Sequence, residues 1–384
     1  MTLYKLPLAL LVFCAPSLPL ACSSSSDAPM SPNSGGTAGA PGGGSATNAG
    51  AGAGGVAAAT GGAAAGTGGT PLPSGGGNAG GADGGGSDAG GASGSDAGGA
   101  ADDSPAARAR GKYLTGLLGC VNCHTPKVNG MLDMANLFGG VDCTADAMGN
   151  CLSVPNLTPD ATGLKDHTDQ QVLDAFRLGK DPDAAMGMPS YLFANMPYYR
   201  FANLSDDDAR AIVAYLRSVP ALMHEVKENT GTFATQPAAP QWTPADPAKL
   251  PPPGAAAPAD ASNGKYLATI MCSTCHTVNT AATAPLHIDE TKAFQGGKTT
   301  TPAGANMMMF QSANLTPDKT GLQGWTQDQI VTAITMAKDK DGKTLCAPMA
   351  GNPVITPEDA KSIADYLLSL TAVANSVTAC MTRM

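Results

Sequence analysis

Two pentapeptides carry the residues of this chain that are best suited to hold a redox cofactor. Two thiols three positions apart can form thioether bonds to the two vinyl groups of one porphyrin, and a histidine directly after them can place its imidazole on the iron. This pattern occurs twice, as Cys120-Val121-Asn122-Cys123-His124 and as Cys272-Ser273-Thr274-Cys275-His276. The spacing therefore predicts two covalently attached haem c groups, with His124 and His276 as iron ligands.

Paired cysteines also occur in zinc sites and in redox-active disulfides. Here each pair has its own histidine and stands in its own half of a repeat, which a shared zinc site would not need. The strand-helix context of a thiol-disulfide enzyme is missing around both pairs. We therefore favour haem attachment over both alternatives.

The second ligand of each iron is predicted from methionine positions. Methionine is the usual partner of histidine in electron-carrying haem proteins. Met196 and Met349 follow their histidines at almost the same spacing, and each has a neighbouring proline that disfavours helix. We expect these two methionines to be the ligands, with Met186 and Met188 as rivals in the first half.

The two pentapeptides belong to a duplicated module. Four landmarks recur in the same order at a nearly constant offset: GKYL at 111–114 and 264–267, the cysteine motif, NLTPD at 156–160 and 314–318, and AYLRS at 214–218 matched by DYLLS at 365–369. We place the first module at 106–224 and the second module at 262–384. The Pro/Ala-rich segment 225–261 between them is predicted to be a semi-stiff linker.

Each module is predicted to be built from helices that position its cysteine motif. An N-terminal helix leads into the motif, and Thr168 and Thr326 open capping boxes for a later helix. The last helix of each module starts at Ser205 or Thr356, where acidic residues in the first turn suit the helix dipole. No alternating strand pattern of useful length occurs, so the expected fold class is all-α, with two tandem helical domains.

The N-terminal part of the chain indicates export. In residues 1–22, Lys5 precedes an apolar run that ends at Ala21-Cys22, as in a signal peptide with a lipoprotein-like cleavage site. Acylation of Cys22 would anchor the protein to a membrane, and ordinary secretion is the alternative. Residues 23–105 are nearly all Gly, Ala, Ser, Thr and Asp, and such a segment is predicted to be a disordered tether. The expected location is the periplasmic side, as a membrane-anchored lipoprotein.

The charge distribution argues against nucleic acid as a partner. The formal net charge is −9, and more than half of it lies in the first 105 residues. Both modules are close to neutral, whereas a nucleic-acid-binding domain would present a basic face.

Both modules resemble class I c-type cytochrome domains, and the pair is similar to the tandem di-haem cytochrome subunits of periplasmic dehydrogenases. The resemblance rests on GKYL, the cysteine motif, NLTPD followed by TGL, the methionine loop and the terminal helix. It covers nearly all of 106–224 and 262–384. It implies crossing N- and C-terminal helices and electron transfer to or from a redox partner protein, a dehydrogenase or a terminal acceptor, without catalysis by this chain. A di-haem peroxidase-like enzyme with one open haem site is the alternative.

Four further cysteines lie outside the attachment motifs and the signal peptide. An even number in an exported protein indicates disulfides. We expect the pairs Cys143–Cys151 and Cys346–Cys380.

Overall fold

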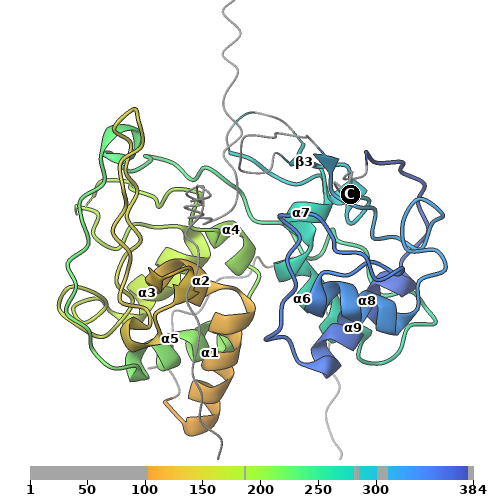
Figure 1. Cartoon of the computed structure of the whole chain (residues 1–384), viewed down its shortest axis with the longest axis horizontal. Coiled ribbons are helices and arrows are strands. Elements are labelled where there is room, and N and C mark those ends of the chain that lie inside the picture. The colour runs from red at the N-terminus through yellow and green to blue at the C-terminus, as the bar shows by residue number, and fades with distance from the viewer. Residues whose placement is uncertain (1–102, 186, 281–282, 284, 301–309, 379–384) are drawn as a thin grey trace, which may run out of the picture. The chain divides into compact units, whose positions relative to one another are not determined.

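The computed structural model describes residues 103–378, apart from 186, 281–282, 284 and 301–309. The described residues are mostly helical and belong to one compact unit (Figure 1). None of the helices in these ranges has the length and apolar composition needed to cross a membrane. The elements up to the end of the first module are α1 (Pro105–Leu117), α2 (Cys120–His124), β1 (Lys127–Val128), β2 (Met131–Leu132), η1 (Met134–Asn136), α3 (Asp169–Leu178), α4 (Tyr198–Phe201) and α5 (Asp206–Ser218).

The second module repeats this order of helices. Its elements, with one short helix of the linker, are η2 (Gly231–Phe233), α6 (Ala261–Met271), α7 (Ser273–His276), η3 (Glu290–Lys292), β3 (Thr299–Thr300), β4 (Phe310–Gln311), α8 (Gln327–Met336) and α9 (Pro357–Ser369). The strands form two short antiparallel hairpins, β1–β2 and β3–β4, which the sequence did not predict. The prediction of a mostly helical fold is confirmed at this coarse level, and the division into two domains stays a prediction.

The helix starts follow the predicted caps. Thr168 and Thr326 each form a complete capping box with a glutamine three residues later. Ser205 and Thr356 accept a hydrogen bond from the third residue of α5 and α9, respectively. These caps satisfy backbone N–H groups that a helix leaves unpaired at its first turn.

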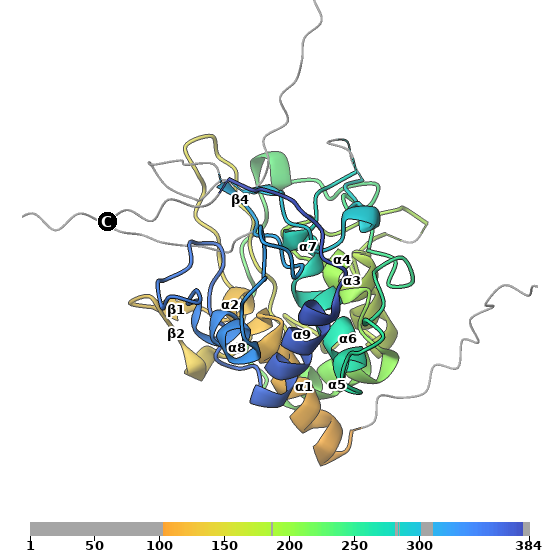
Figure 2. The same cartoon turned by 90° about the vertical axis from the view of Figure 1, so that its right-hand side faces the viewer.

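In each module the first and last helices cross at a glycine. α1 packs on α5, and α6 packs on α9 (Figure 2). A Cβ atom on Gly111 would lie 1.9 Å from the carbonyl oxygen of Ala211, and one on Gly264 would lie 1.8 Å from that of Ser362. The backbones therefore approach more closely than any residue with a side chain allows.

In each module a buried phenylalanine packs against the last helix. Phe138 and Phe294 are fully buried, and both adopt a φ of 61°, which is rare for a bulky residue. The Phe138 ring packs edge-to-face on Tyr215 at 6.1 Å, and the Phe294 ring packs likewise on Tyr366 at 5.6 Å. The same unusual backbone conformation in both halves supports the duplication.

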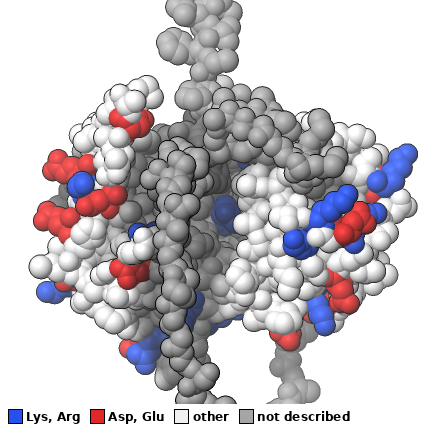
Figure 3. Space-filling view, in the orientation of Figure 1, with Lys and Arg blue, Asp and Glu red and all other residues white. Residues whose placement is uncertain are grey.

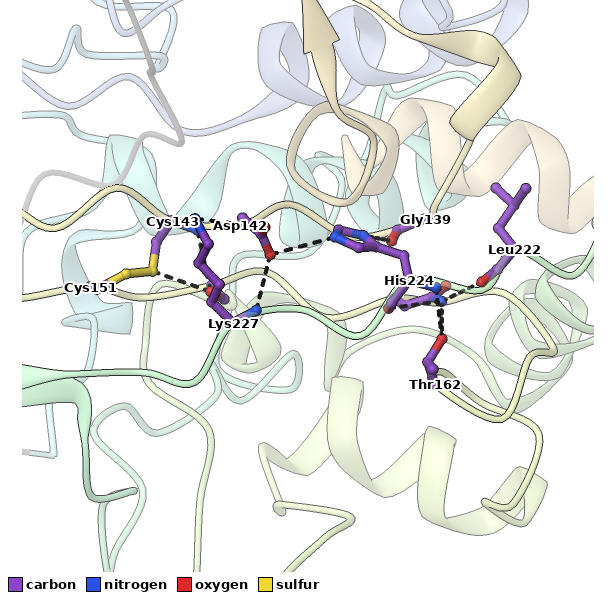
Figure 4. A network of polar contacts seen from close by, with 10 residues as sticks. Gly139, Asp142, Cys143, Cys151, Thr162, Leu222, His224 and Lys227 are labelled. Carbon is purple, nitrogen blue, oxygen red and sulfur yellow. Dashed lines mark hydrogen bonds and ion pairs between the residues drawn. A yellow bond between two sulfur atoms is a disulfide. The ribbon is translucent and has the colours of Figure 1, made fainter.

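In each module, side-chain hydrogen bonds hold the segment that follows the last helix, and we call this segment the strap. The Asn156 side-chain amide donates to the carbonyl of Leu222 at 2.7 Å, and Asn314 does the same to Val373 at 2.8 Å. In the first module the His224 ring continues this network to Gly139 and Asp142 (Figure 4). The NLTPD motif therefore ties the chain that leaves the last helix to the loop behind the cysteine motif.

The disulfide Cys143–Cys151 is present, with its Cα atoms 5.4 Å apart, which confirms that pairing. The predicted partner of Cys346 is Cys380, which lies outside the described residues. The signal peptide, Cys22, Met186 and the tether up to residue 102 also lie outside them.

The modules contact each other through two reciprocal tyrosine-aspartate hydrogen bonds. The Tyr113 hydroxyl of α1 donates to Asp359 of α9 at 2.5 Å, and the Tyr266 hydroxyl of α6 donates to Asp208 of α5 at 2.7 Å. Tyr113 and Tyr266 are the tyrosines of the two GKYL motifs. Each module thus reaches the start of the other module's last helix by the same residue, and we call this contact region the seam.

The linker segment contributes a tryptophan to the seam. Trp242 is only 4% exposed and stacks on Tyr199 with ring centres 4.5 Å apart. Its backbone N–H donates to the Tyr198 hydroxyl, and the N–H of the following residue, Thr243, donates to Leu286 in the second module. The linker is therefore packed against both modules at this point.

Replacement of Gly111 should test the helix crossing. We expect Gly111→Ala to lower the free energy of unfolding by about 1–3 kcal/mol, the usual cost of overpacking, although alanine favours an isolated helix. Gly116→Ala in the same helix is the control, because its added Cβ would meet only the exposed Val354 side chain, at 3.0 Å, and no backbone atom. Urea unfolding of both variants measures the difference, and equal stabilities would contradict the close crossing.

Removal of either tyrosine hydroxyl should weaken the seam. Tyr113→Phe and Tyr266→Phe should each lower the free energy of unfolding by roughly 1–2 kcal/mol, since each removes a hydrogen bond to a carboxylate. Tyr191→Phe is the control for loss of a hydroxyl elsewhere. Chemical denaturation monitored by circular dichroism gives the values, and a seam variant as stable as the control would argue against these contacts.

Candidate haem sites

Each cysteine motif forms one helical turn directly after the first helix of its module. In the first module α1 ends before Gly119, whose φ of 80° breaks the helix, and α2 starts at Cys120. In the second module α6 ends at Met271 and α7 follows at once. Residues three apart lie on the same side of such a turn, so the paired sulfurs can face one porphyrin edge.

A single hydrogen bond orients each histidine. His124 Nδ1 lies 2.9 Å from the carbonyl oxygen of Pro155, and His276 Nδ1 lies 2.8 Å from that of Ala313. Both carbonyls belong to the residue just before an NLTPD motif. With Nδ1 engaged, Nε2 is the nitrogen left to bind a metal, which is the usual arrangement at a metal-binding histidine.

The histidines are also in the protonation state that ligation needs. Burial lowers the pKa of His124 to about 4, and burial likewise lowers the pKa of His276. Both rings are therefore neutral near pH 7, and a neutral imidazole can donate its electron pair to iron.

The four cysteines of the two motifs differ in their chemical state. Cys120, Cys272 and Cys275 carry free thiols. Burial raises the pKa of Cys120 and that of Cys272 to about 12. Cys123 is in a disulfide, so it would have to be reduced before it could form a thioether.

The predicted methionine ligands occupy equivalent loops but different surroundings. Met196 lies between α3 and α4, partly buried and packed against the core. Met349 lies between α8 and α9 and is 36% exposed. The rival Met188 is 69% exposed. The packing in the first module thus favours Met196 over Met188.

Four residues near the cysteine-motif turns were not predicted from the sequence. Tyr199 and Arg200 follow Met196 closely in α4, and the Tyr199 hydroxyl is buried without a hydrogen-bond partner among the described residues. Trp242 stacks on Tyr199, and Lys298 lies over the Trp242 ring at 4.6 Å. The only sequence signal for these residues was the dipeptide Tyr198-Tyr199, close after the predicted ligand Met196. The residues that pack on this dipeptide come from distant segments of the chain.

The donor set fits a c-type haem. Each turn offers sulfurs in the attachment spacing and a neutral histidine with its second nitrogen already held by a carbonyl. Both features recur at equivalent positions of the two modules. The first module offers a partly buried thioether as well.

Comparison with known proteins agrees with this geometry. The family model described as cytochrome c matches residues 108–220. The chain is 28% identical over 302 residues to the cytochrome c subunit of alcohol dehydrogenase (quinone) from Gluconobacter oxydans (strain 621H), covering 71% of this chain and 57% of that protein. It is 26% identical over 304 residues to the fructose dehydrogenase cytochrome subunit of Gluconobacter japonicus, covering 70% and 53%.

A shorter match involves a third kind of dehydrogenase. The gluconate 2-dehydrogenase cytochrome c subunit of Pantoea cypripedii is 34% identical over 124 residues, covering 30% of this chain and 24% of that protein. The chain thus spans little more than half the length of its first two relatives.

These findings define the class of protein. Residues 108–220 form a cytochrome c family domain, and haem c is the cofactor that this family implies. The chain is distantly homologous to the cytochrome c subunits of quinone-dependent dehydrogenases.

Proposed function

We propose that the chain is a di-haem electron carrier that accepts electrons from a dehydrogenase and passes them to a further acceptor outside the cytoplasm. One haem c would be held by Cys120, Cys123 and His124, and the other by Cys272, Cys275 and His276. Met196 and Met349 would complete the two sets of iron ligands.

The observation that carries this proposal is the repetition of the histidine geometry. In both modules Nδ1 is bound by the carbonyl that precedes NLTPD, at 2.9 and 2.8 Å. The family model covers only the first module, so the second haem rests on this structural equivalence and on the repeated cysteine motif.

A bound haem would supply a reversible one-electron couple. The chain's own residues would attach it, orient the proximal imidazole and keep water from its faces. Phe138, Phe294 and the crossing helices provide the apolar wall behind each turn. The side chains described around the two turns do not include an arrangement that we can assign to acid-base catalysis.

The dehydrogenase partner is proposed from the relatives. Three of them are cytochrome subunits of dehydrogenases that act on an alcohol, fructose or gluconate. On the face drawn in Figure 3, acidic and basic side chains are interspersed over both modules. Membrane attachment through an acylated Cys22 is part of the same proposal.

One observation favours the peroxidase-like alternative for the second module. Such an enzyme needs an iron whose second axial position can open, and the Met349 side chain is 36% exposed, whereas Met196 is packed against the core. The two functions differ in spin state: a carrier holds two six-coordinate low-spin haems, and a peroxidase holds one high-spin haem that reacts with peroxide.

Haem counting on cysteine variants tests the two attachment sites. We expect two haems per wild-type chain and one in each of the double variants Cys120→Ser/Cys123→Ser and Cys272→Ser/Cys275→Ser, because each removes one pair of thioethers. Cys143→Ser/Cys151→Ser should keep both haems. Absorbance of the haem and mass of the intact chain give the count, and a single haem in the wild type would refute the di-haem proposal.

The ligand assignment is tested by the sulfur-to-iron absorption band. Met196→Ala and Met349→Ala should each remove about half of this band and lower one midpoint potential, since loss of the thioether disfavours the reduced iron. Met188→Ala should change neither property. If Met349→Ala has no effect and peroxide reacts with the wild-type protein, the peroxidase-like alternative holds.

A further inference from the structure

Two cations lie at the seam beside the attachment turns. Arg200 of α4 donates from Nε to the carbonyl of Ile270 at 3.1 Å and from Nη2 to that of Met271 at 3.3 Å. These carbonyls end α6, directly before Cys272. Lys298 donates from Nζ to the carbonyl of Thr274, inside the second turn, at 2.8 Å.

Neither cation is neutralised by a carboxylate within the described parts of the chain. Other arginines of this protein are neutralised in this way, since Arg110, Arg177 and Arg217 each have an aspartate oxygen within 3.0 Å. Among the described residues, the hydrogen bonds of the Arg200 and Lys298 side chains go to carbonyls, Lys298 also lies over the Trp242 ring, and both cations are half-buried. Because no opposite charge cancels them nearby, their fields extend further into the surrounding protein.

The two cations differ in the turns that they reach. Arg200 closely follows the predicted ligand Met196 of the first module, and its guanidinium is hydrogen-bonded to the end of α6, directly before Cys272 of the second module. Lys298 is hydrogen-bonded to Thr274, inside the turn of its own module. Arg200 is therefore shared between the modules, whereas Lys298 belongs to the second.

The duplication supplies an uncharged counterpart of Arg200. Asn352 follows Met349 much as Arg200 follows Met196, and its amide donates to the carbonyl of Leu117 at 2.9 Å. Leu117 ends α1 as Met271 ends α6. The hydrogen bond across the seam is thus made from both sides, but only the first module makes it with a charge.

We propose that Arg200 is a shared electrostatic control that raises the reduction potentials of both haems. This proposal rests on the di-haem function proposed above. A fixed positive charge favours the redox state with less positive charge, and a haem that accepts one electron loses one unit of positive charge. No bond or proton has to move in this step.

Redox titration of the haem-loaded full-length protein tests the proposal, with dithionite as the electron donor and ferricyanide as the acceptor. Arg200→Met should lower both midpoints, each by about a tenfold change in the ratio of oxidised to reduced haem, which is ~59 mV for one electron. Arg200→Lys should keep both near the wild-type values. Lys298→Met should lower one midpoint, and Lys112→Met on the exposed face of α1 should lower neither.

Several outcomes would overturn the role of Arg200. One is a midpoint that stays unchanged in Arg200→Met, and another is an equal shift in Arg200→Lys, which would mean that the hydrogen bonds matter rather than the charge. If the neutral variants do not mature, Asn352→Arg decides, because a second charge at the mirrored position should raise both midpoints and no rise would refute the proposal.

Failure of this inference can be told from failure of the di-haem function. Two haems per chain with potentials that do not respond to Arg200 would overturn the electrostatic role alone. A wild-type chain that carries fewer than two haems would overturn both.

Discussion

The carbonyl that binds each histidine Nδ1 is the constraint on which the rest of the site depends. It fixes the ring so that only Nε2 can reach a metal, and it belongs to the residue before NLTPD. The next residue, Asn156 or Asn314, holds the strap that follows the last helix. The predicted histidine ligand is thus joined through the backbone to the element that closes the module, and the last helix is held against the first by the glycine crossing.

The linker and the seam also affect the candidate haem sites, because the helices that they contact lead into the cysteine-motif turns. The first helix of each module ends at its cysteine-motif turn, so any contact with the end of α1 or α6 is a contact beside a candidate haem site. Arg200, in α4 just after the loop of the predicted ligand Met196, and Asn352, in the loop of the predicted ligand Met349, make such contacts. The seam therefore brings the segment around the predicted methionine of one module next to the cysteine-motif turn of the other.

The sequence predicted those features that depend on local chemistry. Caps at Thr168, Ser205 and their counterparts were predictable because a side chain satisfies N–H groups within the same turn. The disulfide Cys143–Cys151 was predictable from two cysteines in one loop. Trp242 was not predictable as a seam residue, since its partners Tyr199 and Lys298 come from the two different modules and a proline-rich composition indicates only a linker.

The duplicated modules share their hydrogen bonds across the seam but differ in charge there. A neutral asparagine makes the bond to the end of α1, so the geometry of the seam does not itself require an arginine. A half-buried cation without a carboxylate partner carries a desolvation cost that the asparagine avoids. Stability alone would therefore favour a neutral residue at position 200, and the proposed electrostatic effect on the two haems would account for the charge.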